Sequence, residues 1–172
     1  MTNSRSRNLD SYVVRLSELK DTDYVPIAHP LAADSSIHLL PLSDRVGLSR
    51  LGLNVGRMPP GQRSFLPHAH AAQEEFVFII SGVGVLVIDE EEDEVRAGDF
   101  VGFPTDGSVH QLRNDGTSDL VYLMGGERTS MDVVSFPTIG KKGFWANGVM
   151  SYVNDDDVQA FAPEDFVVRT KE

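Results

Sequence analysis

The sequence contains no cysteine at all. Disulfide bonds and thiolate metal ligands are therefore both excluded, so any metal site must use imidazole or oxygen donors. A chain of 172 residues is nevertheless long enough to bury a core of one domain without covalent cross-links. A protein that needs no disulfides fits a reducing compartment, and we predict a cytoplasmic location.

Long hydrophobic runs are missing as well. No apolar segment approaches the roughly 18 residues that a membrane-spanning helix needs. The opening stretch, MTNSRSRNLDSY, lacks the apolar core of a secretory signal peptide. We therefore expect neither a membrane span nor a secretion signal.

Positive charge is scarce. The chain has 15 Lys and Arg residues against 26 Asp and Glu residues, which gives a net charge of −11. A surface with this charge repels nucleic-acid phosphates and anionic lipid headgroups. Nucleic acids and membrane surfaces are thus excluded as expected partners, and a small-molecule ligand is favoured.

Turn-forming residues divide the chain into three parts. Residues 1–44 form a partly irregular N-terminal extension. Within it, residues 9–19 could be a short strand or a helical stretch, and a strand-like segment around Tyr12–Leu16 could pair with a partner chain. Residues 45–125 hold short apolar runs separated by Gly, Pro, Asn and Asp, a pattern typical of β-sandwiches and barrels. Residues 126–172 form a C-terminal extension that we expect to pack on this barrel core.

Short elements are also expected outside the core pattern. In the C-terminal extension, residues 132–134 and 166–168 resemble short strands, and residues 163–165 can begin a turn of helix. The acidic run 89–94 lies between two strand-like runs and lacks the spaced ligands and glycine of an EF-hand loop. We interpret it as a solvated hairpin tip rather than a calcium site.

The strongest functional signal is a group of histidines and carboxylates. His68 and His70 are two residues apart, so on an extended segment their side chains point to the same side. The adjacent acids Glu74 and Glu75 offer a carboxylate, and the residues alone do not choose between them. With His110, this set would supply the nitrogen and oxygen donors that divalent transition metals prefer.

Two longer motifs surround these residues. In the first, His68-x-His70 follows Gly61, and exactly six residues separate Glu75 from Gly82. The second runs from Gly98 to Asn114 and places Pro104, Gly107 and His110 in that order. Together the two stretches resemble the paired sequence motifs of the cupin superfamily, and the spacing to Gly82 favours Glu75 over Glu74.

This resemblance implies an all-β fold, a double-stranded β-helix that forms a small jelly-roll barrel. It also implies one divalent metal, such as Zn, Fe, Mn or Ni, held by His68, His70, Glu75 and His110. Asn114 shares the strand face of His110 and is expected to point inward. Small cupins are commonly homodimers, so a homodimer is expected here.

Four protein ligands leave coordination positions for a substrate oxygen or water. We therefore expect a metal-dependent enzyme of isomerase, oxygenase, decarboxylase or lyase type, acting on a small oxygen-rich metabolite such as a sugar or an organic acid. The alternative is a cupin that binds or senses a small molecule without chemistry.

The sequence names no second catalytic group, and the catalytic residues are unknown at this stage. Five polar residues are candidates, although each is more often an ordinary surface or core residue: Arg57, Gln62, Glu74, Tyr122 and Arg128. Candidate residues for the barrel lining are Val77, Ile79, Val85 and Val87. His29 and His38 match no motif and are treated as bystanders.

Overall fold

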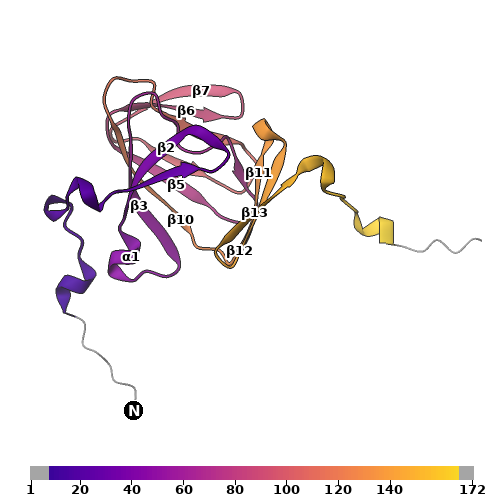
Figure 1. The fold of residues 1–172 in the computed structure, drawn as a ribbon, viewed down its shortest axis with the longest axis horizontal. Helices are drawn as coiled ribbons and strands as arrows, with labels where there is room; N and C mark the ends of the chain where they lie inside the picture. Colours follow the sequence, from indigo (N-terminus) through magenta and orange to yellow (C-terminus); the bar gives the residue numbers. More distant parts are fainter. Residues whose placement is uncertain (1–7, 167–172) are drawn as a thin grey trace, which may run out of the picture.

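A computed structural model describes residues 8–166, and it is dominated by antiparallel β-sheet (Figure 1). The largest sheet has six strands, in the order β1 (Val25–His29), β2 (Ala32–Pro41), β3 (Leu51–Met58), β10 (Leu120–Glu127), β5 (Glu75–Ser81) and β8 (Phe100–Phe103). Strands that are neighbours in this sheet are often distant in sequence, as expected for a jelly roll. The predicted all-β jelly-roll fold is thereby confirmed.

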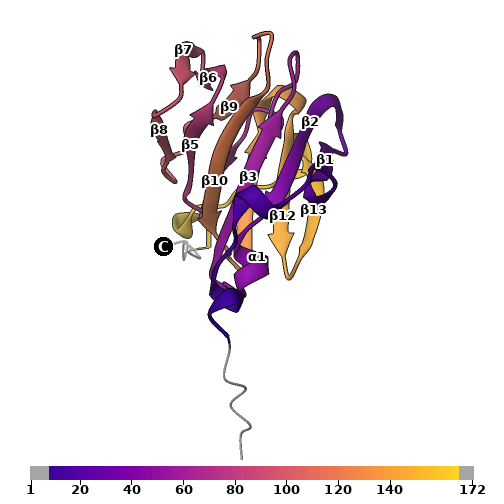
Figure 2. The same cartoon turned by 90° about the vertical axis from the view of Figure 1, so that its left-hand side faces the viewer.

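Two smaller sheets complete the sandwich. One contains β7 (Glu91–Arg96), β6 (Val83–Ile88) and β9 (His110–Arg113). The other contains β13 (Val149–Asn154), β12 (Lys141–Ala146), β11 (Met131–Phe136) and β4 (Ala69–His70). Figure 2 shows β2, β3, β10 and β5 side by side as one layer, with β12 and β13 near β2 and the β6–β7 hairpin near β5.

Helical structure within residues 8–166 is limited to single turns. These are α1 (Ser43–Val46) and 3-10 helices at Leu9–Tyr12, Leu16–Glu18, Asp21–Asp23, Pro137–Ile139, Asp155–Asp157 and Pro163–Phe166. None of the helices in this part of the chain is long and apolar enough to cross a bilayer.

The core lies between the layers and is built from alternating strand positions. On β5, Val77 and Ile79 are buried, whereas Phe78 and Ile80 between and after them are exposed. The buried pair packs with Leu112 and other apolar side chains of the main core. Val77 and Ile79 therefore point inward, as the sequence predicts.

The prediction for β6 is wrong by one residue. Leu86 and Ile88 pack against the core, rather than Val85 and Val87. The cause is the register with β9, in which Leu86 lies opposite the buried Leu112 and Ile88 lies opposite His110. Residues directly opposite each other in a ladder share a face, and a shift of one residue reverses every side chain of a strand.

The N-terminal segment differs from its expected structure. Two 3-10 turns replace the strand proposed around Tyr12–Leu16, and the segment's first regular strands are β1 and β2. The backbone N–H and the hydroxyl of Ser11 both donate to the carbonyl of Asn8, at 2.9 and 2.7 Å, and close a local turn. Such local bonds compete with strand pairing. β2 then pairs with β3 and joins the main sheet.

The C-terminal extension is also built into the fold, because β11 pairs with β4 of the metal-motif region. The helical turn expected at 163–165 is present as the 3-10 helix Pro163–Phe166. The strand expected at 166–168 falls largely outside the described residues, and Phe166 itself ends that 3-10 helix.

The acidic run is more regular than a simple hairpin tip. Only Asp89 and Glu90 form the turn, and residues 91–94 belong to the exposed strand β7. Asp89 has a φ of 53°, and its carboxylate accepts a hydrogen bond from the backbone N–H of Val109 at 2.9 Å. Asp is among the few residues that tolerate this left-handed conformation.

The four motif glycines all have positive φ angles, between 76° and 97°: Gly61, Gly82, Gly98 and Gly107. At Gly82 the backbone also comes very close to its neighbour, because a Cβ there would lie 2.6 Å from the carbonyl oxygen of Asp119. Both the conformation and the space therefore require glycine at the β5–β6 turn.

The side chain of Asn114 links the end of β9 to two loops through hydrogen bonds. Its amide nitrogen donates to the carbonyls of Met58 and Ser118, at 2.7 and 2.8 Å, and its amide oxygen accepts from the N–H of Gly116 at 3.1 Å. The side chain is completely buried, as predicted. These bonds explain why an asparagine is useful at this motif position.

Replacing Asn114 with Ala should lower the free energy of unfolding by about 3 kcal/mol, because buried carbonyls then lose their donor. Urea denaturation of N114A would measure this change. Thr117→Ala, at an exposed position of the same loop, serves as the control and should change stability by less than about 0.5 kcal/mol. Similar losses in both variants would contradict the role of the Asn114 bonds.

Candidate metal centre

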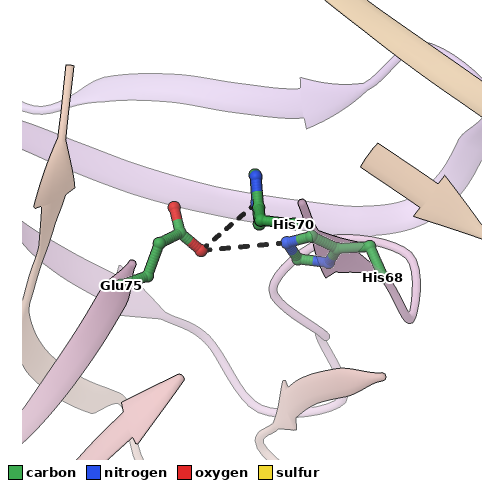
Figure 3. A group of neighbouring side chains, drawn as sticks. All are labelled: His68, His70 and Glu75. Carbon is green, nitrogen blue, oxygen red and sulfur yellow. Dashed lines mark ion pairs between the residues drawn. The ribbon is translucent and has the colours of Figure 1, made fainter. Parts of the chain in front are cut away.

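Four predicted residues meet between the layers of the sandwich. One carboxylate oxygen of Glu75, Oε2, lies 3.4 Å from Nε2 of His70, 3.6 Å from Nε2 of His110 and 3.9 Å from Nε2 of His68. Figure 3 shows Glu75 directed at His68 and His70. The donor atoms of His68, His70 and Glu75 all lie within 4.8 Å of one another.

Backbone pairing brings these residues together. His68 lies just before β4 and pairs with His110 at the start of β9, and their rings are 4.5 Å apart. His70 ends β4, and residues 71–74 turn the chain so that Glu75 begins β5 on the same side. Glu75, rather than the exposed Glu74, therefore faces the histidines.

Hydrogen bonds to the other ring nitrogen orient two of the imidazoles. Nδ1 of His68 donates to the carbonyl of Leu66 at 2.7 Å, and Nδ1 of His70 bonds to the carboxylate of Asp132 at 2.5 Å. With its proton on Nδ1, each neutral ring presents the lone pair of Nε2 to the centre. Metal-binding histidines in proteins almost always have such an outer partner.

Asp132 is a further residue of the candidate centre that the sequence did not reveal. It lies on β11, its side chain is 1% exposed, and its second oxygen accepts the N–H groups of Ala72 and Val133, both at 2.8 Å. The only sign of its role in the sequence was its position as a single acidic residue in the mostly apolar stretch 131–136. Its position beside His70 depends on the pairing of β11 with β4, which is not written in local sequence.

His110 carries a buried and unsatisfied atom. Its ring stacks on Phe103 at 4.0 Å, and its Nε2 is shielded from solvent with no hydrogen-bond partner among the described residues. A buried ring nitrogen without a partner is costly. A metal ion between His110 and Glu75 would satisfy this atom, so the residues present fit a divalent metal.

The protonation states also fit metal binding. Burial, and next the neighbouring His110, lower the pKa of His68 to about 4, so its imidazole is neutral at pH 7. Burial by itself raises the pKa of Glu75, but His110 and then the other two imidazoles outweigh it and hold the pKa below its usual range. The centre thus combines neutral imidazole with an ionised carboxylate, the forms that bind metal.

The cluster opens into a cavity of about 300 Å³ that reaches His68, His70 and Glu75. Its walls are mostly apolar and come from distant segments: Ile27, Phe65, Val134, Phe136 and Met150. Two further polar residues, His29 and Tyr152, line the same space. His29, which the sequence treats as a bystander, thus lies at the cavity, whereas His38 lies outside it, 3.5 Å from Arg57.

None of the five candidate catalytic residues from the sequence lines this cavity. Tyr122 is fully buried in the core, where burial raises its pKa. Arg57 and Arg128 form ion pairs with Asp21 and Asp44.

The remaining two candidates of that set, Gln62 and Glu74, are also outside the cavity. They lie close to the motifs in sequence, but proximity in sequence did not identify the residues near the centre. His29 and Tyr152 arrive from β1 and β13, far from the motifs.

Comparison with known proteins agrees with this architecture. The family model of the cupin domain matches residues 54–126. A solved structure from Acidithiobacillus ferrooxidans, provisionally named a sugar phosphate isomerase, is 30% identical, with a TM-score of 0.86 over 90% of this chain and 99% of its own. A sugar phosphate isomerase of the cupin superfamily from Silicibacter pomeroyi is also 30% identical, with a TM-score of 0.72 over 80% of this chain and 90% of its own.

Curated relatives match over a shorter region. The oxalate-binding protein of Thermotoga maritima is 34% identical over 67 residues, which is 39% of this chain and 54% of that protein. The chain spans about half the length of the curated relatives it matches. With both sequence motifs, the jelly-roll architecture and two solved structures at 30% identity matched along nearly their whole length, this chain belongs to the cupin superfamily.

Proposed function

We propose that the protein is a metal-dependent enzyme that holds one divalent ion with His68, His70, Glu75 and His110 and acts on a small oxygen-bearing molecule. The observation that carries this proposal is the convergence of three Nε2 atoms on one carboxylate oxygen, beside a cavity of about 300 Å³ that His68, His70 and Glu75 line. A site this close to a cavity can be reached by a ligand.

The bound ion would act as a Lewis acid that polarises a carbonyl or carboxylate oxygen of the substrate. The chain supplies the surroundings for this chemistry. Asp132 and the carbonyl of Leu66 fix the orientation of the imidazoles. The apolar walls limit the water around the reacting group, which strengthens electrostatic effects.

Among the reaction classes considered, isomerisation has the most support. Two solved structures at 30% identity that are matched over most of their length carry the name sugar phosphate isomerase. Such a reaction takes a proton from the hydroxyl-bearing carbon next to the carbonyl and returns one to the former carbonyl carbon, while a second proton moves between the two oxygens. A polarised carbonyl makes the first proton easier to remove. The oxalate-binding relative supports a small oxygen-rich ligand more generally.

Turnover can be tested by proton exchange. Manganese-loaded protein would be incubated in D2O with dihydroxyacetone, fructose or fructose 6-phosphate, and deuterium next to the carbonyl would be followed by NMR. We expect exchange that EDTA and His70→Ala abolish. Binding of these compounds without exchange would contradict the enzyme and favour the alternative of a non-catalytic binding cupin.

Asp132→Asn should weaken metal binding about 10- to 100-fold, because loss of an outer carboxylate reduces the basicity and order of the ligating imidazole. Calorimetric titration of the metal-free protein with Zn²⁺ would measure the affinity. Asp156→Asn, at an exposed position, is the matched control and should bind Zn²⁺ as the wild type does. Equal affinities for all three proteins would argue against the His70–Asp132 contact as part of a metal site.

A homodimer completes the proposal. Phe78, Ile80 and Phe100 are 40%, 43% and 65% exposed, and the adjacent Phe76 stacks on Phe100 at 5.6 Å. These side chains share the outer face of β5 and the edge strand β8. An apolar patch beside an open sheet edge favours association with a second copy.

Light scattering should therefore give about twice the chain mass of 18.9 kDa. Phe100→Asp should shift the mass toward the monomer, since a charge would be buried in the interface. Phe161→Asp alters a similarly exposed aromatic residue that lies beyond the last strand, β13, and belongs to neither β5 nor β8, and it should leave the mass unchanged. A wild-type mass near 18.9 kDa would refute the dimer.

A further inference from the structure

The cavity has a second polar group besides the metal centre. Nε2 of His29, at the end of β1, lies 3.2 Å from the hydroxyl of Tyr152 on β13, although 123 residues separate them. The ring of Phe136 contacts both, at 5.5 Å from His29 and 5.7 Å from Tyr152. The same ring stacks on His68 at 5.9 Å, so a single aromatic ring links the two polar groups.

The direction of the hydrogen bond can be deduced. The backbone N–H of Leu31 donates to Nδ1 of His29 at 3.2 Å, so this nitrogen carries no proton. A neutral His29 then bears its proton on Nε2 and donates it to the oxygen of Tyr152. Burial lowers the pKa of His29 and raises that of Tyr152, which keeps both groups neutral at pH 7.

This arrangement leaves the Tyr152 proton unused. Its oxygen accepts from His29, and the O–H has no other acceptor among the hydrogen bonds formed by the described residues. Since Tyr152 lines the cavity, a ligand oxygen there can accept that proton. His29 holds the phenol oxygen in place, and the phenol O–H is the group offered to the ligand.

Charge in the cavity restricts the ligand further. Glu75 is the only acid among the described residues that line it, and neither Lys nor Arg lines it. A phosphate dianion beside the Tyr152 end would therefore be partly desolvated without a cationic side chain to pair with. The apolar walls suit a compact uncharged body instead.

We propose that His29 and Tyr152 form a binding site for a hydroxyl or carbonyl oxygen at the end of the ligand remote from the metal. The cavity of about 300 Å³ then selects a compact molecule with oxygen at both ends and no phosphate. This inference rests on the proposed function for the metal-binding end. It names the substrate class as unphosphorylated hydroxy-carbonyl compounds.

Two pyrones provide a matched pair of probes. Kojic acid and allomaltol chelate metals through the same two oxygens, and kojic acid alone has a hydroxyl at the remote end of the ring. Visible spectra of the cobalt-loaded full chain would give both affinities. We expect wild type to bind kojic acid about 5-fold more tightly than allomaltol, the value of one hydrogen bond.

Tyr152→Phe should bind both pyrones equally, because it removes the hydroxyl and keeps the ring that packs on Phe136. Tyr24→Phe, a tyrosine that lies against Arg57 outside the cavity, should keep the 5-fold preference. Equal wild-type affinities, or a preference that survives Tyr152→Phe, would overturn the inference and leave the metal proposal standing.

Two further outcomes separate the proposals. If cobalt binds but neither pyrone changes its spectrum, the proposed function fails, and the inference fails with it. Competition with kojic acid tests whether the cavity disfavours a phosphate group on the ligand. Fructose should displace it at least as well as fructose 6-phosphate does, and stronger displacement by the phosphate would overturn the predicted substrate class.

Discussion

The pairing of His68 with His110 is the contact on which the rest of the centre depends. Their backbones exchange two hydrogen bonds, of 2.8 and 3.2 Å, at a point where no longer ladder joins the two strands. Through this pair the sheet of β6, β7 and β9 meets the sheet that begins with β4. Together with the hydrogen bonds that join residues 61–64 to residues 112–114, this contact closes the sandwich, and it sets the distance between two imidazoles.

Buried polar atoms such as those of the centre need hydrogen-bond partners in well-defined positions. Asp132 has three partners, an imidazole and two backbone N–H groups, so its buried charge is fully compensated. The Nε2 atom of His110, by contrast, has no hydrogen-bond partner among the described residues. The fold thus uses hydrogen bonds to fix the outer groups of the centre and leaves the inner donor atoms available.

The fold class could be predicted because the cupin resemblance rests on two short motifs with fixed spacing. The same resemblance favoured Glu75 over Glu74 and pointed to His110, and the structure brings these side chains close to His70 or to each other. The outer groups could not be predicted in this way. Asp132, His29 and Tyr152 reach the site through strand pairings between distant segments, and neither spacing nor alternation encodes those pairings.

Predictions from the local sequence also failed where the same residues could form either of two structures. Val85 and Leu86 are both apolar, and only the register with β9 decides which one is buried. Around Tyr12, periodicity allowed either a strand or a helical stretch, and the bonds of Ser11 to Asn8 form a turn there. The cupin-domain match, residues 54–126, likewise stops before the segment that forms the far wall.

The far wall of the cavity is formed by one nearly continuous piece of chain. Strands β11 to β13, residues 131–154, contribute Val134, Phe136, Met150 and Tyr152 to the cavity, but none of the four inner ligands. Substitutions there can remodel the shape of the cavity while the inner donors stay in place. The proposed metal ligands and the far wall of the cavity thus come from separate parts of the chain, so substitutions in one hairpin-rich stretch can change which molecules fit without replacing any of those ligands.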